Sequence, residues 1–276
     1  MLAAIQPLLA LLVGVLAALM LGGAPVAITV LRRLAPFQTW RLRRWFQLEG
    51  AVTRPRELQG EIAGRDVLVK SFGSDVVVSL RNLRVPDTFE LVRRRPGAAS
   101  DQLSGDERFD RWYVRRSTRG DGLELLTAQL RERLVALAER GVAVTVSNGR
   151  LYATVQDRRR YHAPELAGSL TELADGLEDA ARDPHESLLE MIQSDPVVST
   201  RWAAIEQLSR LTPATEQLRR LWTWAEKQPD PEIRLGVAVA IRDRARIDEE
   251  VQRGEALPVS IQRAAALLER MPAPRY

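Results

Sequence analysis

The sequence predicts an α+β protein with three parts: an N-terminal transmembrane helix, a mostly antiparallel sheet domain with two helices, and a C-terminal domain made only of helices. Three observations lead to this prediction. The first 31 residues carry no charge, the middle of the chain alternates β-branched runs with turn signals, and no strand pattern follows Pro184. The expected limits are 1–31 for the anchor, 32–46 for a juxtamembrane segment, 47–183 for the α+β domain and 184–276 for the helical domain.

The N-terminal segment is long and hydrophobic, with residues 8–31 as its most apolar part. A helix of about 20 apolar residues crosses a bilayer. A cleaved signal peptide would carry a basic residue before the apolar run, and none precedes it here. A buried helix of a globular core would be shorter. The segment is therefore predicted to be an uncleaved, single-pass membrane anchor.

Basic and aromatic residues follow this segment without an acidic residue among them. They are Arg32, Arg33, Trp40, Arg41, Arg43, Arg44, Trp45 and Phe46. Arginines mark the cytoplasmic flank of a span, and indole rings and guanidinium groups lie at the level of lipid headgroups. We therefore expect an inner-membrane protein with its N-terminus outside, the bulk of the chain in the cytoplasm and the lipid bilayer as a partner. In a second interpretation, these arginines determine topology and form no specific lipid site.

Charge and composition exclude several classes of function. The formal net charge is +4, but the five arginines of residues 1–47 account for the whole excess, so the rest of the chain is close to neutral. A nucleic-acid-binding face is therefore not expected. The chain has no cysteine, which excludes disulfides, thiolate catalysis and cysteine metal sites.

The first half of the α+β domain has the pattern of an antiparallel meander. Turn signals at Ala63-Gly64 and Gly73-Ser74 divide residues 57–83 into β-branched runs. The next expected elements are a strand at 88–92, a loop at 96–105 and a strand at 111–117.

The second half of this domain combines two helices with a hairpin. Thr127 is a candidate N-cap for a helix that runs to Arg140, where Gly141 would end it. The Asn148-Gly149 pair between alternating valines predicts a hairpin with a type I′ turn. A second helix is expected from Pro164, with apolar residues at helical spacing: Leu166, Leu170, Leu173 and Leu177.

Residues 104–180 resemble the soluble module of an uncharacterised family of bacterial membrane-anchored proteins. The resemblance rests on the GDERFDRWYVRRS strand, the LELLTAQL helix start and the GVAVTVSNGRLYATV hairpin. It covers less than a third of the chain, and its aromatic spacing before Val114 departs from the family pattern by one position. The motif implies packing, with Phe109, Trp112, Tyr113 and Val114 in the core, and it implies no activity.

The C-terminal part contains an internal repeat. Asp195-Pro196 and Asp230-Pro231 each start a helical segment, and Arg201 aligns with Arg234 at a period of 33 residues; a weaker third copy contains Arg263. The aspartate-proline start, the inward arginine and the small residues resemble HEAT repeats, which implies stacked helix pairs with a shared core. An unrelated helical bundle is the alternative.

Residues suited to catalysis or metal binding are few. His162 and His185 have no second histidine at ligand spacing, and no nucleotide-binding or hydrolase motif occurs. Asp175, Asp179 and Asp183 share one helical face, which predicts a solvated face or, less simply, a site for a cation or a basic partner. No catalytic residue, cofactor or metal is therefore predicted.

The expected function is that of a membrane-anchored, non-enzymatic interaction or scaffold protein whose short helical-repeat stack binds a partner protein. Two alternatives remain. One is a module that senses a ligand or lipid, and the other is an enzyme with an unrecognised site near residues 96–110 and His162. An acidic or apolar groove on the helical stack would favour the scaffold. The sequence does not predict an oligomeric state.

Overall fold

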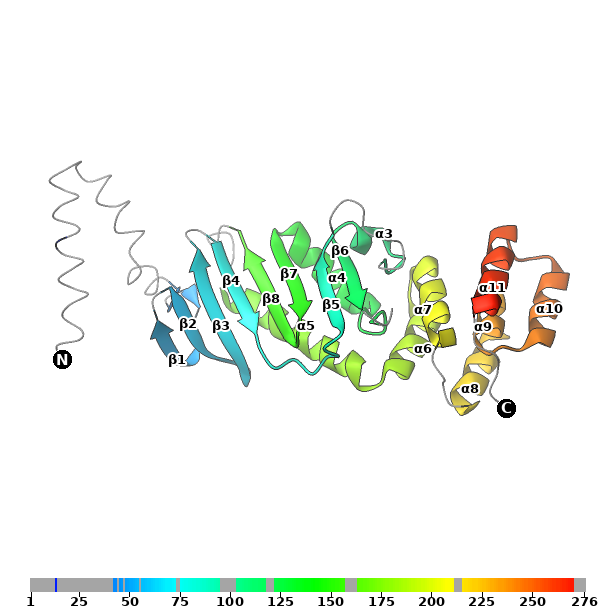
Figure 1. Cartoon of the computed structure of the whole chain (residues 1–276), viewed down its shortest axis with the longest axis horizontal. Coiled ribbons are helices and arrows are strands. Elements are labelled where there is room, and N and C mark those ends of the chain that lie inside the picture. The colour runs from blue at the N-terminus through cyan, green and yellow to red at the C-terminus, as the bar shows by residue number, and fades with distance from the viewer. Residues whose placement is uncertain are drawn as a thin grey trace. The chain divides into compact units, whose positions relative to one another are not determined.

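The structure is a computed structural model that describes residues 13, 42–43, 45–46, 48–54, 56–72, 75–94, 103–117, 122–156, 163–210 and 215–270. Figure 1 labels the helices and strands of the chain. The chain divides into two compact units. The first unit comprises Met1–Asp87 and Ala136–Asp175, and the second comprises Thr88–Val135 and Gly176–Tyr276.

The first unit contains an antiparallel sheet with the strand order β1-β2-β3-β4-β8-β7. Its strands are β1 (Glu49–Arg54), β2 (Glu57–Ile62), β3 (Arg65–Phe72), β4 (Asp75–Leu80), β7 (Val142–Ser147) and β8 (Arg150–Val155). The predicted hairpin between β7 and β8 is confirmed, because Asn148 and Gly149 have φ values of 51° and 63°, as a type I′ turn requires. The strand β1 was not predicted.

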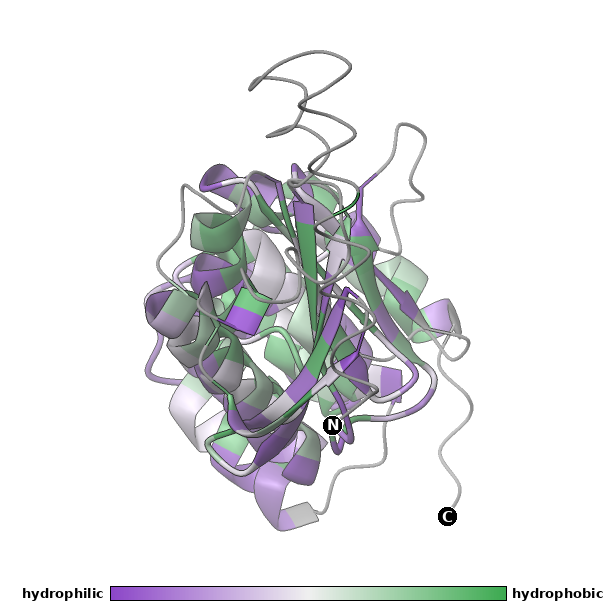
Figure 2. Cartoon of the chain, turned by 90° about the vertical axis from the view of Figure 1, so that its left-hand side faces the viewer, coloured by the Kyte–Doolittle hydropathy of each residue, from purple (hydrophilic) through white to green (hydrophobic). Residues whose placement is uncertain are grey.

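The core of this unit follows one face of the sheet. A single row of paired residues crosses five strands, and each of its members is at most 1% exposed: Leu58, Val69, Val78, Ala153 and Val144. Figure 2 shows hydrophobic residues along these strands. Helix α5 (Ala163–Arg182) begins in this unit and buries Leu166, Leu170 and Leu173. Full burial of each aliphatic side chain contributes about 1.5–3 kcal/mol.

The second unit begins with a two-stranded antiparallel pair, β5 (Phe89–Arg93) and β6 (Tyr113–Ser117). Between them lies α3 (Glu107–Asp110), whose N-cap Asp106 accepts hydrogen bonds from two backbone amides. Helix α4 (Ala128–Glu139) begins in this unit as predicted, and Gly141 follows it with a φ of 85°.

Six further helices complete the second unit. They are α6 (Pro184–Ser194), α7 (Val198–Arg210), α8 (Thr215–Ala225), α9 (Pro231–Ala240), α10 (Arg244–Arg253) and α11 (Pro258–Arg270). Helix α9 lies at the centre, because all its residues from Ile233 to Ala240 are buried and it packs against α7, α8, α10 and α11. The expectation of an α+β fold with C-terminal helices is thus confirmed.

The 33-residue period corresponds to a repeated contact. Arg201 donates from Nε to the carbonyl of Asp195 at 2.5 Å, and Arg234 donates from Nη1 to the carbonyl of Gln228 at 2.9 Å. Each arginine therefore holds the carbonyl six residues before it, just ahead of its own helix. The third copy differs, since the guanidinium of Arg263 lies over the ring of Trp202, 5.4 Å from the centroid.

The prediction of a transmembrane helix is wrong for the part of the chain that the structure describes. None of the described helices is both long enough and apolar enough to span a bilayer. The longest, α5, has 20 residues, but each of its charged side chains would cost about 2.5–3.5 kcal/mol near the bilayer centre. Residues 8–31, whose hydropathy led to the prediction, lie outside the described residues apart from Val13. The single-pass inner-membrane localisation and its topology are therefore not retained.

Candidate functional site: an acidic groove

The start of α4, the end of α5 and helix α6, all in the second unit, line a groove of about 470 Å³. Its floor is apolar and includes the buried side chains of Leu130, Ala180 and Met191. Four exposed carboxylates line the same groove: Asp179, Asp183, Glu186 and Glu190. No lysine or arginine occurs among the described residues that line it. The groove therefore combines an apolar floor with negative charge.

The junction between α5 and α6 places these carboxylates next to one another. Asp183 alone separates the two helices, and its Oδ1 accepts a hydrogen bond of 3.0 Å from the backbone N–H of Glu186. Pro184 occupies the first turn of α6, where a missing N–H costs nothing. The acidic residues continue across this junction at intervals of three or four positions, so one carboxylate follows about every helical turn.

Helix α5 approaches α4 closely at the groove because of Gly176. A Cβ at this position would lie 2.7 Å from Cδ2 of Leu130. Any larger residue would displace the end of the Leu130 side chain. The glycine therefore allows α5 to lie close to Leu130 of α4.

The groove carboxylates are only partly compensated. Asp179 pairs with Arg182 at 2.9 Å, but both side chains are mostly exposed, so the pair contributes at most about 1 kcal/mol. Asp183 has a structural task as the N-cap of α6. Glu186 and Glu190 are exposed, form no ion pair within the described residues, and repel each other by about 0.2–0.5 kcal/mol at their i,i+4 spacing. A cationic group in the groove would remove this repulsion.

Asp195 also lines the groove, but a buried arginine neutralises it. Arg131 is 1% exposed, and its Nη2 lies 2.9 Å from both carboxylate oxygens of Asp195. The same guanidinium donates from Nε to Asp106 at 3.0 Å and from Nη1 to the carbonyl of Leu126 at 2.8 Å. This network fixes α4 to the N-cap of α3 and to the start of α7, and so it stiffens one wall of the groove.

The repeat residues predicted from the sequence make structural contacts. Asp195 and Asp230 accept hydrogen bonds of 3.0 and 2.9 Å from the amides of Val197 and Glu232, while Pro196 precedes α7 and Pro231 begins α9. Burial disfavours the charge of Arg234, yet its hydrogen bonds to Glu250 and Glu255 outweigh this and raise the pKa of Arg234 above its usual value. These residues build the helical stack, and Asp195 is the one among them that also lines the groove.

The residues predicted at a lipid interface fall into two groups. Arg32, Arg33, Trp40, Arg41 and Arg44 lie outside the described residues. Arg43 is exposed and Trp45 is half-buried, but Phe46 is only 1% exposed and its ring lies 5.4 Å from that of Trp45. Phe46 is therefore packed within protein. The lipid-contact assignment depended on the rejected span and is not retained.

An enzyme site near residues 96–110 and His162 was the alternative prediction. The acidic residues of this region that the structure describes form hydrogen bonds within the fold. His162 and residues 96–102 lie outside the described residues. The carboxylate of Asp110 accepts hydrogen bonds from the backbone and hydroxyl of Ser104 and from the amide of Gly105, and that of Asp106 binds Arg131. Among the described residues, no three histidine or acidic side chains are grouped to hold a metal ion.

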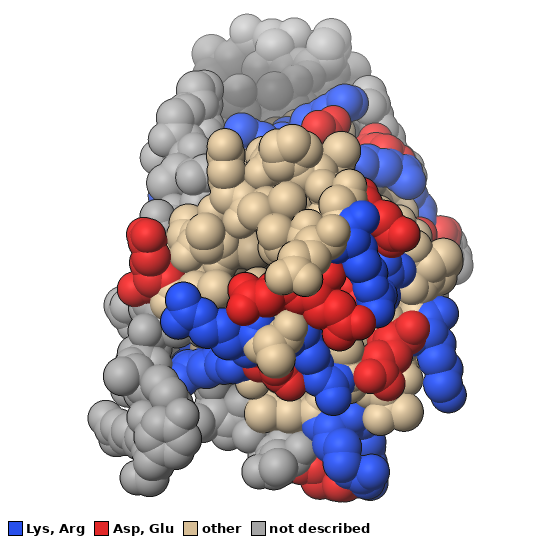
Figure 3. All heavy atoms as spheres, turned by 90° about the vertical axis from the view of Figure 1, so that its right-hand side faces the viewer, with Lys and Arg blue, Asp and Glu red and all other residues tan. Residues whose placement is uncertain are grey.

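A second exposed surface lies at the end of the helical stack. Val251, Leu257 and Val259 are 36%, 60% and 65% exposed on α10, on the connecting turn and on α11. Figure 3 shows an uncharged area at this end of the protein, bordered by charged side chains. The acidic groove has a defined lining and volume, so it is the better defined site.

Sequence reasoning identified two of the four groove carboxylates and missed the others. Asp179 and Asp183 belong to the acidic face noted in the sequence, whereas its third member, Asp175, pairs with Arg65 of β3. Glu186 and Glu190 were missed because α6 was not predicted. Its signal is present, since Asp183-Pro184 is a third aspartate-proline helix start like those of α7 and α9.

No protein family, curated protein or solved structure compared with the chain matches it.

Proposed function

We propose that the protein is a non-enzymatic interaction module whose acidic groove binds a basic segment of a partner protein. The observation that carries this proposal is the chemistry of the groove. Four carboxylates surround an apolar floor, and no basic residue of the described lining balances them.

The spacing of the carboxylates favours an extended partner over a single small cation. They follow one another by about one turn of helix, and a turn rises about 5.4 Å. A protein segment that carries cationic side chains at similar intervals can pair with several carboxylates at once. Its apolar side chains can cover Leu130 and Met191 on the floor. Charge complementarity of this kind steers association and selects among partners.

The helical stack supports the same function as a scaffold. The two equivalent contacts of Arg201 and Arg234 support the interpretation of α6–α9 as HEAT-like repeats. Stacks of this kind present extended surfaces of side chains, which suit protein partners better than small substrates. The groove opens beside α6, the first helix of this stack.

A titration with a labelled peptide of alternating arginine and leucine tests the proposal. The full chain should bind this peptide, and it should bind a glutamate-leucine peptide much more weakly. The Glu186→Gln/Glu190→Gln variant should bind the basic peptide about ten-fold more weakly, because two partly exposed charge pairs together contribute about 1.4 kcal/mol. Fluorescence anisotropy measures both affinities.

The matched control is Asp248→Asn/Glu269→Gln, which removes two exposed acidic residues of α10 and α11 that do not line the groove. It should bind like the unmodified chain. Equal affinity of the groove variant and the control variant would overturn the proposal, and so would equal binding of the basic and acidic peptides.

A further inference from the structure

We propose that the basic partner of the groove is a second copy of this chain, which inserts an arginine cluster at α3. This inference rests on the proposed function of the groove. The arginine cluster consists of Arg93, Arg94 and Arg111, and all three side chains are exposed.

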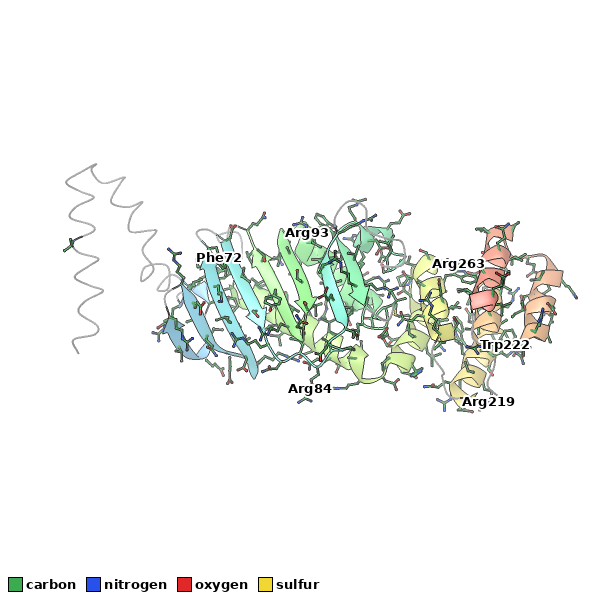
Figure 4. All side chains as sticks on the ribbon, viewed as in Figure 1. Phe72, Arg84, Arg93, Arg219, Trp222 and Arg263 are labelled. Atoms are coloured by element: carbon green, nitrogen blue, oxygen red, sulfur yellow. The ribbon has the colours of Figure 1, made fainter. Side chains whose placement is uncertain are left out.

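Contacts within the second unit bring these arginines together around the C-terminal end of α3. The guanidinium of Arg93 lies over the ring of Trp112, 5.6 Å from its centroid, and Arg93 is labelled in Figure 4. Arg94 donates from Nη1 to the carbonyl of Asp110 at 2.7 Å. Arg111 is the C-cap of α3. The strand β5 and the helix α3 thus contribute to one basic surface.

The acidic residues of α3 and of its N-cap do not balance the cluster. Asp106 is bound to Arg131, and the carboxylate of Asp110 is buried and turned toward Ser104 and Gly105. Glu107 is the one exposed acid of α3. Within the described part of this region, three exposed guanidinium groups and the one exposed carboxylate of Glu107 leave the cluster positive.

The charge of the cluster is opposite to that of the groove, and the two surfaces are also complementary in the types of side chain that they offer. Guanidinium groups bind carboxylates through two parallel hydrogen bonds, so Arg93 and Arg111 suit the row of groove carboxylates. Trp112 is half-buried beside them and offers an apolar surface of the kind that the floor residues Leu130 and Met191 can contact. Aromatic and arginine side chains are the usual anchors of protein interfaces.

The groove and the cluster are different surfaces, so association can take two forms. Two copies can exchange the contact reciprocally in a two-fold dimer, or each copy can bind the next one head to tail in a chain or a ring. The contact depends on exposed charges, and salt therefore weakens it.

Sedimentation velocity of the full chain tests this inference. A non-ionic detergent should be present to suppress association through the apolar residues 1–31. At about 0.05 M salt the unmodified chain should form species larger than a monomer as its concentration rises, and at about 0.5 M salt association should weaken at least ten-fold. Both Glu186→Gln/Glu190→Gln and Arg93→Gln/Arg111→Gln should remain monomeric.

Mixing these two variants gives the sharpest result. The first keeps an intact cluster and the second keeps an intact groove, so the mixture should form a one-to-one complex that grows no further. The control variant Arg219→Gln/Arg220→Gln, which loses two exposed arginines of α8, should associate like the unmodified chain.

A chain that stays monomeric at low salt, or a mixture that does not form the complex, would overturn this inference. The peptide titration then decides separately about the groove. If the unmodified chain binds the arginine-leucine peptide but does not self-associate, the groove has a different basic partner. If it does neither, the proposed function fails as well.

Discussion

The single residue that connects most of the second unit is Arg131. It is the largest fully buried side chain of the described residues, and it carries a charge. Its three nitrogens are all used by Asp195, Asp106 and the carbonyl of Leu126. A buried ion pair adds little net stability over an apolar replacement of both partners, but removal of one partner leaves the other charge unpaired. The network therefore specifies where α3, α4 and α7 meet.

Replacement of this arginine should be strongly destabilising. Arg131→Met should lower the free energy of unfolding by about 3–5 kcal/mol, because two carboxylates lose their cation. Urea denaturation measures the change. Arg140→Met is the control, since Arg140 forms an exposed pair with Glu165 and its loss should cost at most about 1 kcal/mol. Adding Asp195→Asn to Arg131→Met should recover part of the loss, and additive losses would contradict the network.

Glu216 on α8 provides a test of the exposed ion pairs of the stack. Hydrogen bonds from Arg219 and Arg220 lower the pKa of Glu216 from 4.5 to about 2. The stabilisation of α8 by this carboxylate is therefore complete above pH 4.5 and is lost as the pH falls through about 2. A carboxyl NMR titration should give a midpoint near 2. The midpoint should return toward 4.5 in Arg219→Gln/Arg220→Gln, and an unmodified Glu216 that already titrates there would refute the pairing.

At the scale of elements, small residues decide how closely the helices approach. Gly236 of α9 faces α7, where an added Cβ would lie 2.8 Å from Cδ1 of Ile205 and 3.1 Å from the ring of Trp202. The sequence repeat placed a small residue at this contact, and the structure shows why. Gly168 of α5, in contrast, has no atom within 4 Å of an added Cβ.

These two glycines form a matched pair. Gly236→Ala should lower the free energy of unfolding by about 1–3 kcal/mol, because the tryptophan ring cannot yield. Gly168→Ala should raise it by about 0.5–1 kcal/mol, since alanine is the better helix former and nothing obstructs it. Thermal denaturation of both variants distinguishes them. Equal effects of the two substitutions would mean that α7 and α9 do not pack as described.

The sequence predicted most elements that bury a periodic face. It missed α6, which buries Leu188, Met191 and Ile192, and it missed elements that bury no such face. The strands β2 to β5 and the β7–β8 hairpin alternate or carry turn residues, and α4 and α5 repeat their leucines at helical spacing. The strand β1 is almost entirely exposed, so its residues show no apolar alternation. Helix α3 has only four residues, too few for a period, and it is defined by its cap Asp106. Both depend on hydrogen bonds that hydropathy does not record.

At the scale of the whole molecule, hydropathy alone led to a wrong prediction of a transmembrane helix, whereas the spacing of the acidic residues predicted part of the groove. The uncharged N-terminal segment predicted a transmembrane helix, and no described helix qualifies as one. The sequence predicted the acidic residues of α5 and Asp183 as one face. It did not predict that this face continues along α6 with Glu186 and Glu190. The lining of the groove also includes Gly176, where a Cβ would meet Leu130, and the buried Met191. These features result from tertiary packing and have no signature in a local sequence pattern.

Reversal of the charge of the groove tests the central claim most directly. We would measure the affinities of the arginine-leucine and glutamate-leucine peptides for the unmodified chain and for Glu186→Arg/Glu190→Arg, with Asp248→Arg/Glu269→Arg as the matched control. If the groove is the binding site, the reversed groove should lose the basic peptide and gain the acidic one, while the control keeps the original preference. A reversed groove that still prefers the basic peptide would contradict the account.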